Sequence, residues 1–147
     1  AGDGGLQMNI QELATVMHNK LPIKLFVYSN GGYLTMKQTQ ELGFEGRLMG
    51  CNDETGLGFP DVVKVGEAHS IRSVRIDSQE NLYEEVRAVV EYDGPVVCDL
   101  VMDPDQMQAP KAINRKMPDG STRQTPLEDM FPFLDEREIR ENMIAEV

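Results

Sequence analysis

The chain has no tryptophan, two cysteines, few basic residues and no long apolar run, and each scarcity excludes a class of protein. Cys51 and Cys98 are too few for the disulfide framework of a small secreted domain. Only 14 basic residues face 25 acidic ones, giving a formal net charge of −11, a sign that opposes nucleic acid and anionic membrane surfaces. No segment approaches the roughly 18 apolar residues of a membrane span. We therefore expect a cytoplasmic protein with no nucleic-acid or membrane partner.

An apolar content of 40% in 147 residues is enough for one hydrophobic core, so we expect one domain. The order of the expected helices and strands indicates its fold class. Apolar periodicity and turn residues predict, in order, a helix at 8–19, a strand at 23–28, a helix at 33–42, a glycine-rich loop at 43–58, a helix at 60–69, a strand at 71–76, a helix opened by a capping box of Asp77 and Glu80, and a strand at 96–102. Alternating helices and strands favour an α/β fold with a three-layer parallel sheet and helices on both faces.

Two domain-level expectations follow from the ends of the chain. A glycine-acid-glycine turn that enters a helix normally follows a strand, so residues 1–103 look like the C-terminal part of a domain that lacks its N-terminal strands. From residue 104 onward, five prolines punctuate polar sequence, and 136–144 is compatible with a short helix. We expect 104–147 to be an acidic extended arm that wraps over the protein surface or a neighbouring subunit.

Chemistry is suggested by two polar turns, Gly2-Asp3-Gly4-Gly5 and Asn30-Gly31-Gly32, whose Asp3 and Asn30 are 27 residues apart. A helix and a strand lie between them, so we expect the turns to meet at the carboxyl ends of neighbouring strands, where ligands bind in such sheets. Asp3 offers a carboxylate oxygen and Asn30 an amide oxygen, which suit Mg²⁺. The glycines leave room for a diphosphate at the helix start. The alternative is two unrelated turns.

These motifs also carry a family resemblance. Gly2-Asp3-Gly4-Gly5-Leu6-Gln7-Met8-Asn9-Ile10-Gln11-Glu12-Leu13-Ala14-Thr15, then Leu21-Pro22-Ile23-Lys24 and Asn30-Gly31-Gly32-Tyr33, resemble the diphosphate-binding domain of thiamine diphosphate-dependent enzymes, acetolactate synthase-like branch. The resemblance covers residues 1–103. It departs at Ser29, where many members carry the first of two asparagines.

The resemblance implies the ligands of the site. Mg²⁺ would be held by Asp3, Asn30 and the carbonyl of Gly32, and the diphosphate by backbone N–H groups of Gly4 and Gly5. The implied cofactor-binding set is Gly2, Asp3, Gly4, Gly5, Asn30, Gly32 and Tyr33.

The activity implied by the resemblance is that of a transferase or lyase, a carboligase or decarboxylase acting on a 2-keto acid such as pyruvate. In that family the activating glutamate belongs to an N-terminal domain, usually across a dimer interface, so no catalytic residue is assigned here and the chain alone is expected to be inactive. Its partners would be the missing N-terminal domains within a homodimer or homotetramer. Two alternatives stay open: two-carbon transfer to a keto sugar in surface-glycan synthesis, or a non-catalytic module that binds metal and diphosphate.

Several other residues receive expectations of their own. Cys98 lies in an apolar strand and is expected to be buried, whereas Cys51 lies in a glycine-rich loop that allows exposure. The residues after the second turn either line the reacting centre (Tyr33, Thr35, Met36 and Gln38) or pack into the core (Leu34 and Met36). The loop 43–58 is long enough to be an active-site flap.

Overall fold

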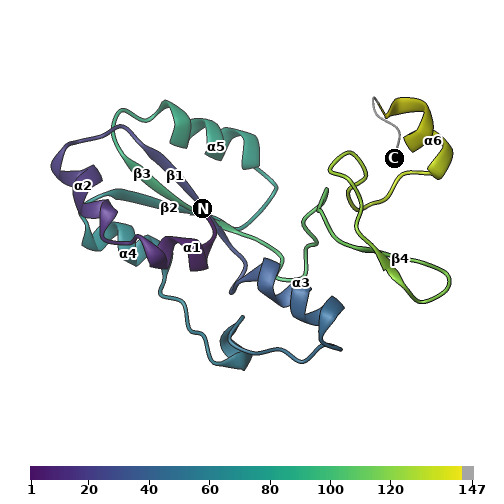
Figure 1. The fold of residues 1–147 in the computed structure, drawn as a ribbon. Coiled ribbons are helices and arrows are strands. Elements are labelled where there is room, and N and C mark those ends of the chain that lie inside the picture. Colours follow the sequence, from purple (N-terminus) through teal and green to yellow (C-terminus); the bar gives the residue numbers. More distant parts are fainter. Residues whose placement is uncertain (144–147) are drawn as a thin grey trace. The chain divides into compact units, whose positions relative to one another are not determined.

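A computed structural model describes residues 1–143, and the chain divides into two compact units, 1–106 and 107–147. The larger unit is built on a parallel sheet of β1 (Lys24–Ser29), β2 (Arg72–Ile76) and β3 (Val96–Val101) (Figure 1). The order across the sheet is β1-β3-β2, so the last strand in sequence is central. This arrangement confirms the α/β fold class.

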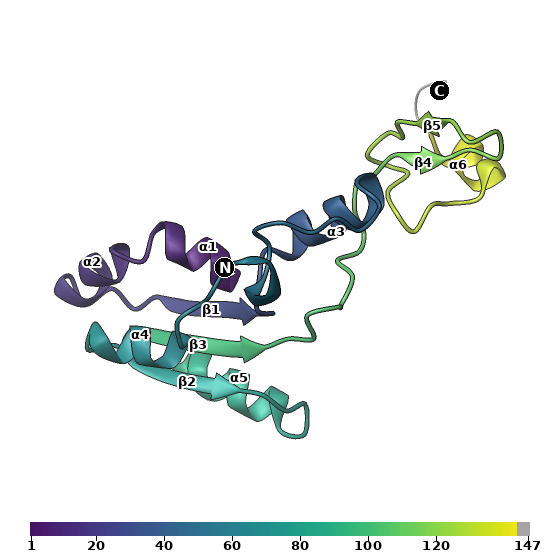
Figure 2. The same ribbon diagram turned by 90° about the horizontal axis from the view of Figure 1, so that it is seen from below.

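Helices cover both faces of this sheet and complete the three layers (Figures 1 and 2). On one face lie α1 (Asp3–Met8), α2 (Glu12–His18) and α4 (Val62–Ala68), and on the other lies α5 (Leu82–Glu91). Two apolar clusters fill the interfaces: the first includes Leu6, Leu13, Val27, Val62, Ile71 and Val97, and the second Ile76, Val89, Val96 and Cys98. The central strand contributes to both clusters, which explains why it is almost entirely apolar.

The expected helix at 8–19 is wrong in its bounds, because the structure has two short helices there. Helix α1 starts at Asp3 and ends at Met8, and the N–H of the next residue, Asn9, donates to the carbonyl of Leu6 at 3.1 Å in a tightened last turn. Asparagine competes with the helix through its own polar side chain and favours helix ends. The first helix begins within the first polar turn, at Asp3, five residues before the expected start at residue 8.

The capping box of Asp77 and Glu80 is also wrong. Helix α5 begins later, at Leu82, and the N–H of Glu80 donates instead to Ser78 Oγ at 3.2 Å. A serine turn thus takes the backbone donor that the capping box would have used.

Between β1 and α4 the chain forms α3 (Leu34–Gly43) and a short 3₁₀ helix, η1 (Asp53–Thr55). Asn52 and Thr55 form a capping box around η1, and the N–H of Cys51 donates to Thr55 Oγ1 at 2.9 Å. These contacts fold the loop inward, so Cys51 is only 1% exposed and the expected room for its exposure is not found. Cys98 is fully buried, as expected.

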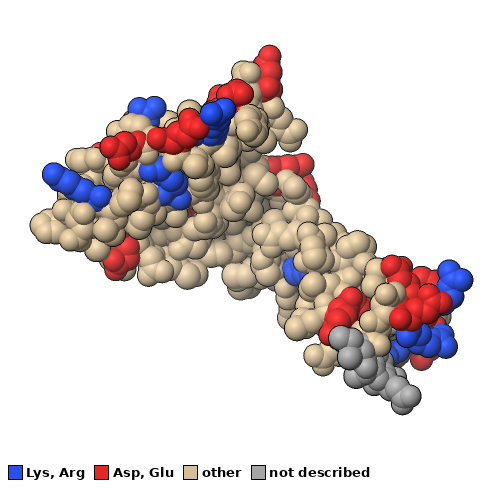
Figure 3. Space-filling model, turned by 90° about the horizontal axis from the view of Figure 1, so that it is seen from above, with Lys and Arg blue, Asp and Glu red and all other residues tan. Residues whose placement is uncertain are grey.

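The smaller unit contains a two-stranded antiparallel ribbon, β4 (Arg115–Lys116) with β5 (Thr122–Arg123), and the helix α6 (Glu136–Asn142). Where an extended arm was expected, residues 107–143 thus form a compact unit. The predicted helix is present as far as Asn142, while its expected last residue, Ile144, lies outside the described residues. Acidic and basic side chains lie intermixed on this unit (Figure 3).

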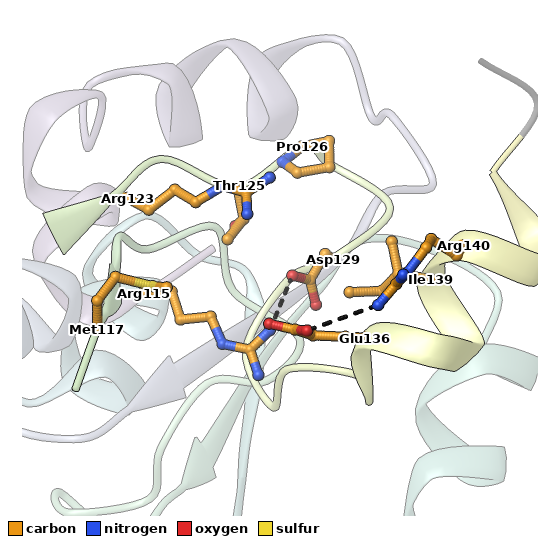
Figure 4. A pocket seen from close by; sticks show the side chains of 9 residues that line it. All are labelled: Arg115, Met117, Arg123, Thr125, Pro126, Asp129, Glu136, Ile139 and Arg140. Atoms are coloured by element: carbon orange, nitrogen blue, oxygen red, sulfur yellow. Dashed lines mark ion pairs between the residues drawn. The ribbon is translucent and has the colours of Figure 1, made fainter. Parts of the chain in front are cut away.

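Asp129 is the centre of the smaller unit. It is 3% exposed, accepts a hydrogen bond from the N–H of Leu134 at 3.0 Å and pairs with Arg115 at 3.6 Å. The side chains of Arg115, Asp129, Glu136 and Arg140 point toward one another at a pocket of about 230 Å³ (Figure 4). Within residues 1–143, no helix has the length and apolar character that crossing a membrane requires.

Candidate functional site

The two polar turns meet at the carboxyl end of β1, as their spacing predicts. Residues 1 and 2 run beside this strand: Gly2 forms a parallel bridge with Tyr28, and the N–H of Tyr28 donates to the carbonyl of Ala1 at 2.8 Å. Asp3 therefore enters α1 next to the point where β1 ends and the Asn30-Gly31-Gly32 turn begins.

Asp3 joins the two turns through its carboxylate. The side chain is 3% exposed; Oδ1 accepts from the N–H of Gly4 at 2.7 Å and Oδ2 accepts from the N–H of Gly31 at 2.8 Å. Each carboxylate oxygen has further acceptor capacity beyond one such bond. The aspartate is thus held in place while keeping lone pairs for a cation.

Asn30 presents an amide oxygen that is buried but unpaired. Its Oδ1 has no hydrogen-bond partner anywhere in residues 1–143. Leaving a buried acceptor unsatisfied costs about 1–3 kcal/mol, so such an atom needs an explanation. A divalent cation is a partner that suits it, since amide oxygens are ordinary ligands of hard cations.

Two glycines of the site are required by close packing. A Cβ on Gly4 would lie 2.5 Å from the ring of Tyr33, whose hydroxyl donates to the carbonyl of Gly4 at 3.3 Å. A Cβ on Gly32 would collide with the carbonyl of Cys51. By contrast, a Cβ on Gly2 or Gly5 would meet no atom within 4 Å. The backbone at Gly5 is therefore open to an approaching ligand.

A cleft of about 610 Å³ lies beyond the carboxyl ends of β1 and β3, the edge at which open α/β sheets bind ligands. Its walls come from residues 29–32 and 51–54, together with Leu34, Lys37, Met102, Pro104 and Asp105. Of the side chains expected either at the reacting centre or in the core, Leu34 lines this cleft. Met36 is 45% exposed, so it does not pack into the core.

Lys37 is a cleft residue that the sequence reasoning missed. It pairs with Asp105, and this hydrogen bond holds the pKa of the Lys37 ammonium above its usual value, so the side chain is cationic at neutral pH. A signal was present: Leu34 and Lys37 are three residues apart in α3 and share one face of that helix, directly after the Asn30 turn.

The arrangement can hold a divalent cation with few protein ligands. Among the described residues, no three side chains of histidine, cysteine, aspartate or glutamate gather as a metal cluster. One carboxylate, one amide oxygen and a backbone carbonyl would be a ligand set of the kind that Mg²⁺ uses when a phosphate and water complete its shell.

Comparison with known proteins identifies what this site resembles. Residues 1–100 match the family described as "Thiamine pyrophosphate enzyme, C-terminal TPP binding domain". The chain is 31% identical over 121 residues to the acetolactate synthase large subunit of Pyropia yezoensis, covering 80% of this chain and 20% of that protein. It is 33% identical over 103 residues to the probable acetolactate synthase large subunit of Methanococcus aeolicus, covering 70% and 17%. The chain thus spans about a fifth of the length of these relatives.

Solved structures support the fold. A thiamine diphosphate-dependent 4-hydroxybenzoylformate decarboxylase from Rhodococcus jostii RHA1 superposes with a TM-score of 0.63 at 19% identity, over 72% of this chain and 19% of that one. Benzoylformate decarboxylase from Polynucleobacter necessarius gives the same TM-score and the same coverage at 23% identity.

Proposed function

The chain belongs to the thiamine pyrophosphate enzymes, matching their C-terminal cofactor-binding domain, and from this premise we propose that it anchors thiamine pyrophosphate through Mg²⁺ at the site of Asp3 and Asn30. The acetolactate synthase-like resemblance is confirmed by the relatives. The observation that carries the proposal is the buried, unpaired Oδ1 of Asn30, beside a turn that the Asp3 carboxylate holds.

Each residue of the proposed site has a distinct task. Asp3, Asn30 and the carbonyl of Gly32 ligate the cation. The backbone N–H of Gly5 receives the diphosphate, while that of Gly4, which donates to Asp3 Oδ1 at 2.7 Å, can do so only by leaving that carboxylate; Gly2 and Tyr33 complete the set. The hydroxyl of Tyr33 donates to the Gly4 carbonyl, and its ring lies edge-on to that of Phe59 at 6.0 Å. These two contacts fix the Tyr33 side chain against the backbone at Gly4.

When bound, thiamine pyrophosphate would itself supply the reactive group, a carbanion that adds to a carbonyl carbon. This chain supplies anchoring and orientation. Asp3, Asn30 and Gly32 would hold the cation and the turn of Gly4 and Gly5 the diphosphate, and such positioning is a major part of the rate gained by enzymes. No residue of this chain is assigned a proton-transfer role.

Within the whole protein we propose a carboligase or decarboxylase acting on a 2-keto acid such as pyruvate. The support is the similarity to acetolactate synthase large subunits, of which this chain spans about a fifth. Further domains, in a homodimer or homotetramer, would supply the catalytic glutamate.

The test is Asp3→Ala in the full-length protein, with binding of thiamine pyrophosphate measured by calorimetry at saturating Mg²⁺. We expect binding to fall below detection, because the variant removes a charged metal ligand and the contact to Gly31. Asp53→Ala is the matched control: it removes an exposed carboxylate of the same cleft and should bind as the wild type does. Unchanged affinity in Asp3→Ala would remove the proposal.

A further inference from the structure

A buried polar network crosses the sheet beside the Asn30 turn. Asp99 of the central strand is 2% exposed, its Oδ1 accepts a hydrogen bond from Ser29 Oγ of β1, and its Oδ2 accepts from Arg75 Nε of β2 at 2.8 Å. Arg75 continues to Asp61, at the N-terminus of α4, at 2.9 Å. One carboxylate therefore ties all three strands together through side chains.

Strand register produces this network. Asp99 lies between Val27 on β1 and Arg75 on β2, and Ser29 is two residues beyond Val27. Because side chains alternate between the faces of a strand, residues 27 and 29 point to the same face. Ser29 and Arg75 are thus the neighbours on that face that can donate to Asp99.

Stability alone does not explain a carboxylate at this position. A buried ion pair recovers little more than its desolvation penalty, and well-packed apolar residues often do as well or better. The same strand shows that apolar residues fit here, since Val96, Val97 and Cys98 are all buried in it. The hydrogen bond to Ser29 is what an apolar residue at 99 would not supply.

Asn30 is bracketed by two such attachments. On its N-terminal side, the carbonyl of Ser29 accepts from the N–H of Met102 at 2.9 Å, and the Ser29 side chain is held by Asp99. On its C-terminal side, the N–H of Gly31 is held by Asp3. Both neighbours are fixed, while the amide oxygen of Asn30 itself is left unpaired.

We propose that Asp99 is a positioning residue which, through Ser29, fixes the backbone of Asn30 so that its amide oxygen is aimed at the cation; this rests on the proposed function. Groups that orient metal ligands from behind typically change metal affinity by about 10-fold to 100-fold when they are removed. The role also gives a function to the Ser29 hydroxyl, which Asp99 holds.

The experiment uses the full-length protein and measures the Mg²⁺ concentration that half-saturates binding of thiamine pyrophosphate. Ser29→Ala and Asp99→Leu should each raise it by about 10-fold to 100-fold. Ser29→Thr keeps the hydroxyl and should restore the wild-type value. Ser73→Ala is the matched control, since it deletes a serine hydroxyl of the same sheet that binds the carbonyl of Ile71.

Thermal unfolding of the metal-free variants separates positioning from folding, and Ser29→Ala decides the matter if Asp99→Leu does not fold. A raised Mg²⁺ requirement in Ser29→Ala but not in Ser73→Ala, with similar unfolding temperatures, supports the proposal. Wild-type Mg²⁺ dependence in Ser29→Ala overturns it, as does an equal rise in Ser73→Ala. The proposed function stands in those cases provided that Asp3→Ala still fails to bind, and it falls if the wild type itself does not bind.

Discussion

The two units of the chain each bury an aspartate beside an arginine, in different surroundings. Asp99 lies in a strand that contributes to two apolar clusters. Asp129 is the most buried side chain among residues 107–143, where no apolar side chain reaches comparable burial. Apolar packing stabilises the unit around Asp99, so this aspartate can serve function. Asp129 has no such core around it, so its own contacts must stabilise the smaller unit.

Charge and ring contacts support the same contrast. Residues 1–106 carry 17 acidic and 8 basic residues, while residues 107–147 carry 8 and 6, so the smaller unit is nearly balanced. There, Arg115 pairs with Asp129 and lies over the ring of Phe133 at 5.2 Å, and that ring packs edge-on to Phe131 at 6.0 Å. The smaller unit is therefore held largely by polar and aromatic contacts around one arginine.

The largest effect is expected from Leu13→Ala in the larger unit. Leu13 is 4% exposed within the first apolar cluster, and truncating such a residue destabilises by about 2–5 kcal/mol. Both cysteines lie in this unit, and burial raises the pKa of the Cys98 thiol to about 11, so it stays protonated and unreactive at pH 8. Thiol labelling in a urea series therefore reports unfolding of this unit alone.

The control is Met8→Ala. Met8 lies in α1, on the same face of the sheet as Leu13, but it is 67% exposed, so the variant should shift the midpoint of thiol labelling little. Equal midpoints for Leu13→Ala and Met8→Ala would show that apolar burial does not hold the larger unit.

A smaller effect, confined to the other unit, is expected from Asp129→Ala. The variant removes the partner of Arg115 and leaves the N–H of Leu134 without its acceptor, a loss of about 1–3 kcal/mol. Hydrogen exchange of residues 107–143 should speed up while the sheet of the larger unit is unaffected. Asp129→Asn keeps an acceptor for Leu134 and should lose less. Equal protection in all three proteins would contradict the view that this aspartate organises the unit.

The smallest effect concerns the pKa of one carboxylate from each unit, the half-buried Asp61 and the exposed Asp119. Arg75 lowers the pKa of Asp61, and the hydroxyl of Ser121 lowers that of Asp119, both from an ordinary value of 3.8. Each carboxylate therefore contributes stability that is present above pH 3.8 and is lost as the pH falls through its lower folded pKa.

Carboxyl NMR titration measures both pKa values. Arg75→Gln should raise the pKa of Asp61 without changing that of Asp119, and Ser121→Ala should do the reverse. A pKa at or above 3.8 for either group in the wild type would be inconsistent with these contacts.

Most of the larger unit could be predicted from the sequence because its signals are local. Two of the strands, β1 and β3, are mostly apolar runs and β2 alternates apolar with polar residues, and all three are found close to their expected bounds. Convergence of Asp3 and Asn30 followed from the general rule for parallel sheets. The predicted helix ends were wrong at two places. Each depends on a single hydrogen bond, from the N–H of Asn9 to Leu6 and from the N–H of Glu80 to Ser78, which apolar periodicity does not predict.

Two kinds of information were beyond such reasoning. The Asp99 network depends on strand order and register, which place residues 29, 75 and 99 together although they are distant in the chain. Within residues 107–143 the sequence indicates prolines, polar stretches and one short helix, but no local pattern predicts that the most buried side chain is that of Asp129. The metal ligands themselves stay a prediction until binding is measured.

The bridge between Gly32 and Asn52 decides how the mouth of the cleft can move. Since Gly32 packs directly on the carbonyl of Cys51, which also accepts from the N–H of Tyr33 at 2.8 Å, residues 51–55 cannot swing outward without breaking those attachments. Residues 51–55 therefore form a fixed wall of the cleft, and the side chain of Gln40 ties down the preceding stretch because it binds both backbone groups of Met49, at 2.8 and 3.0 Å.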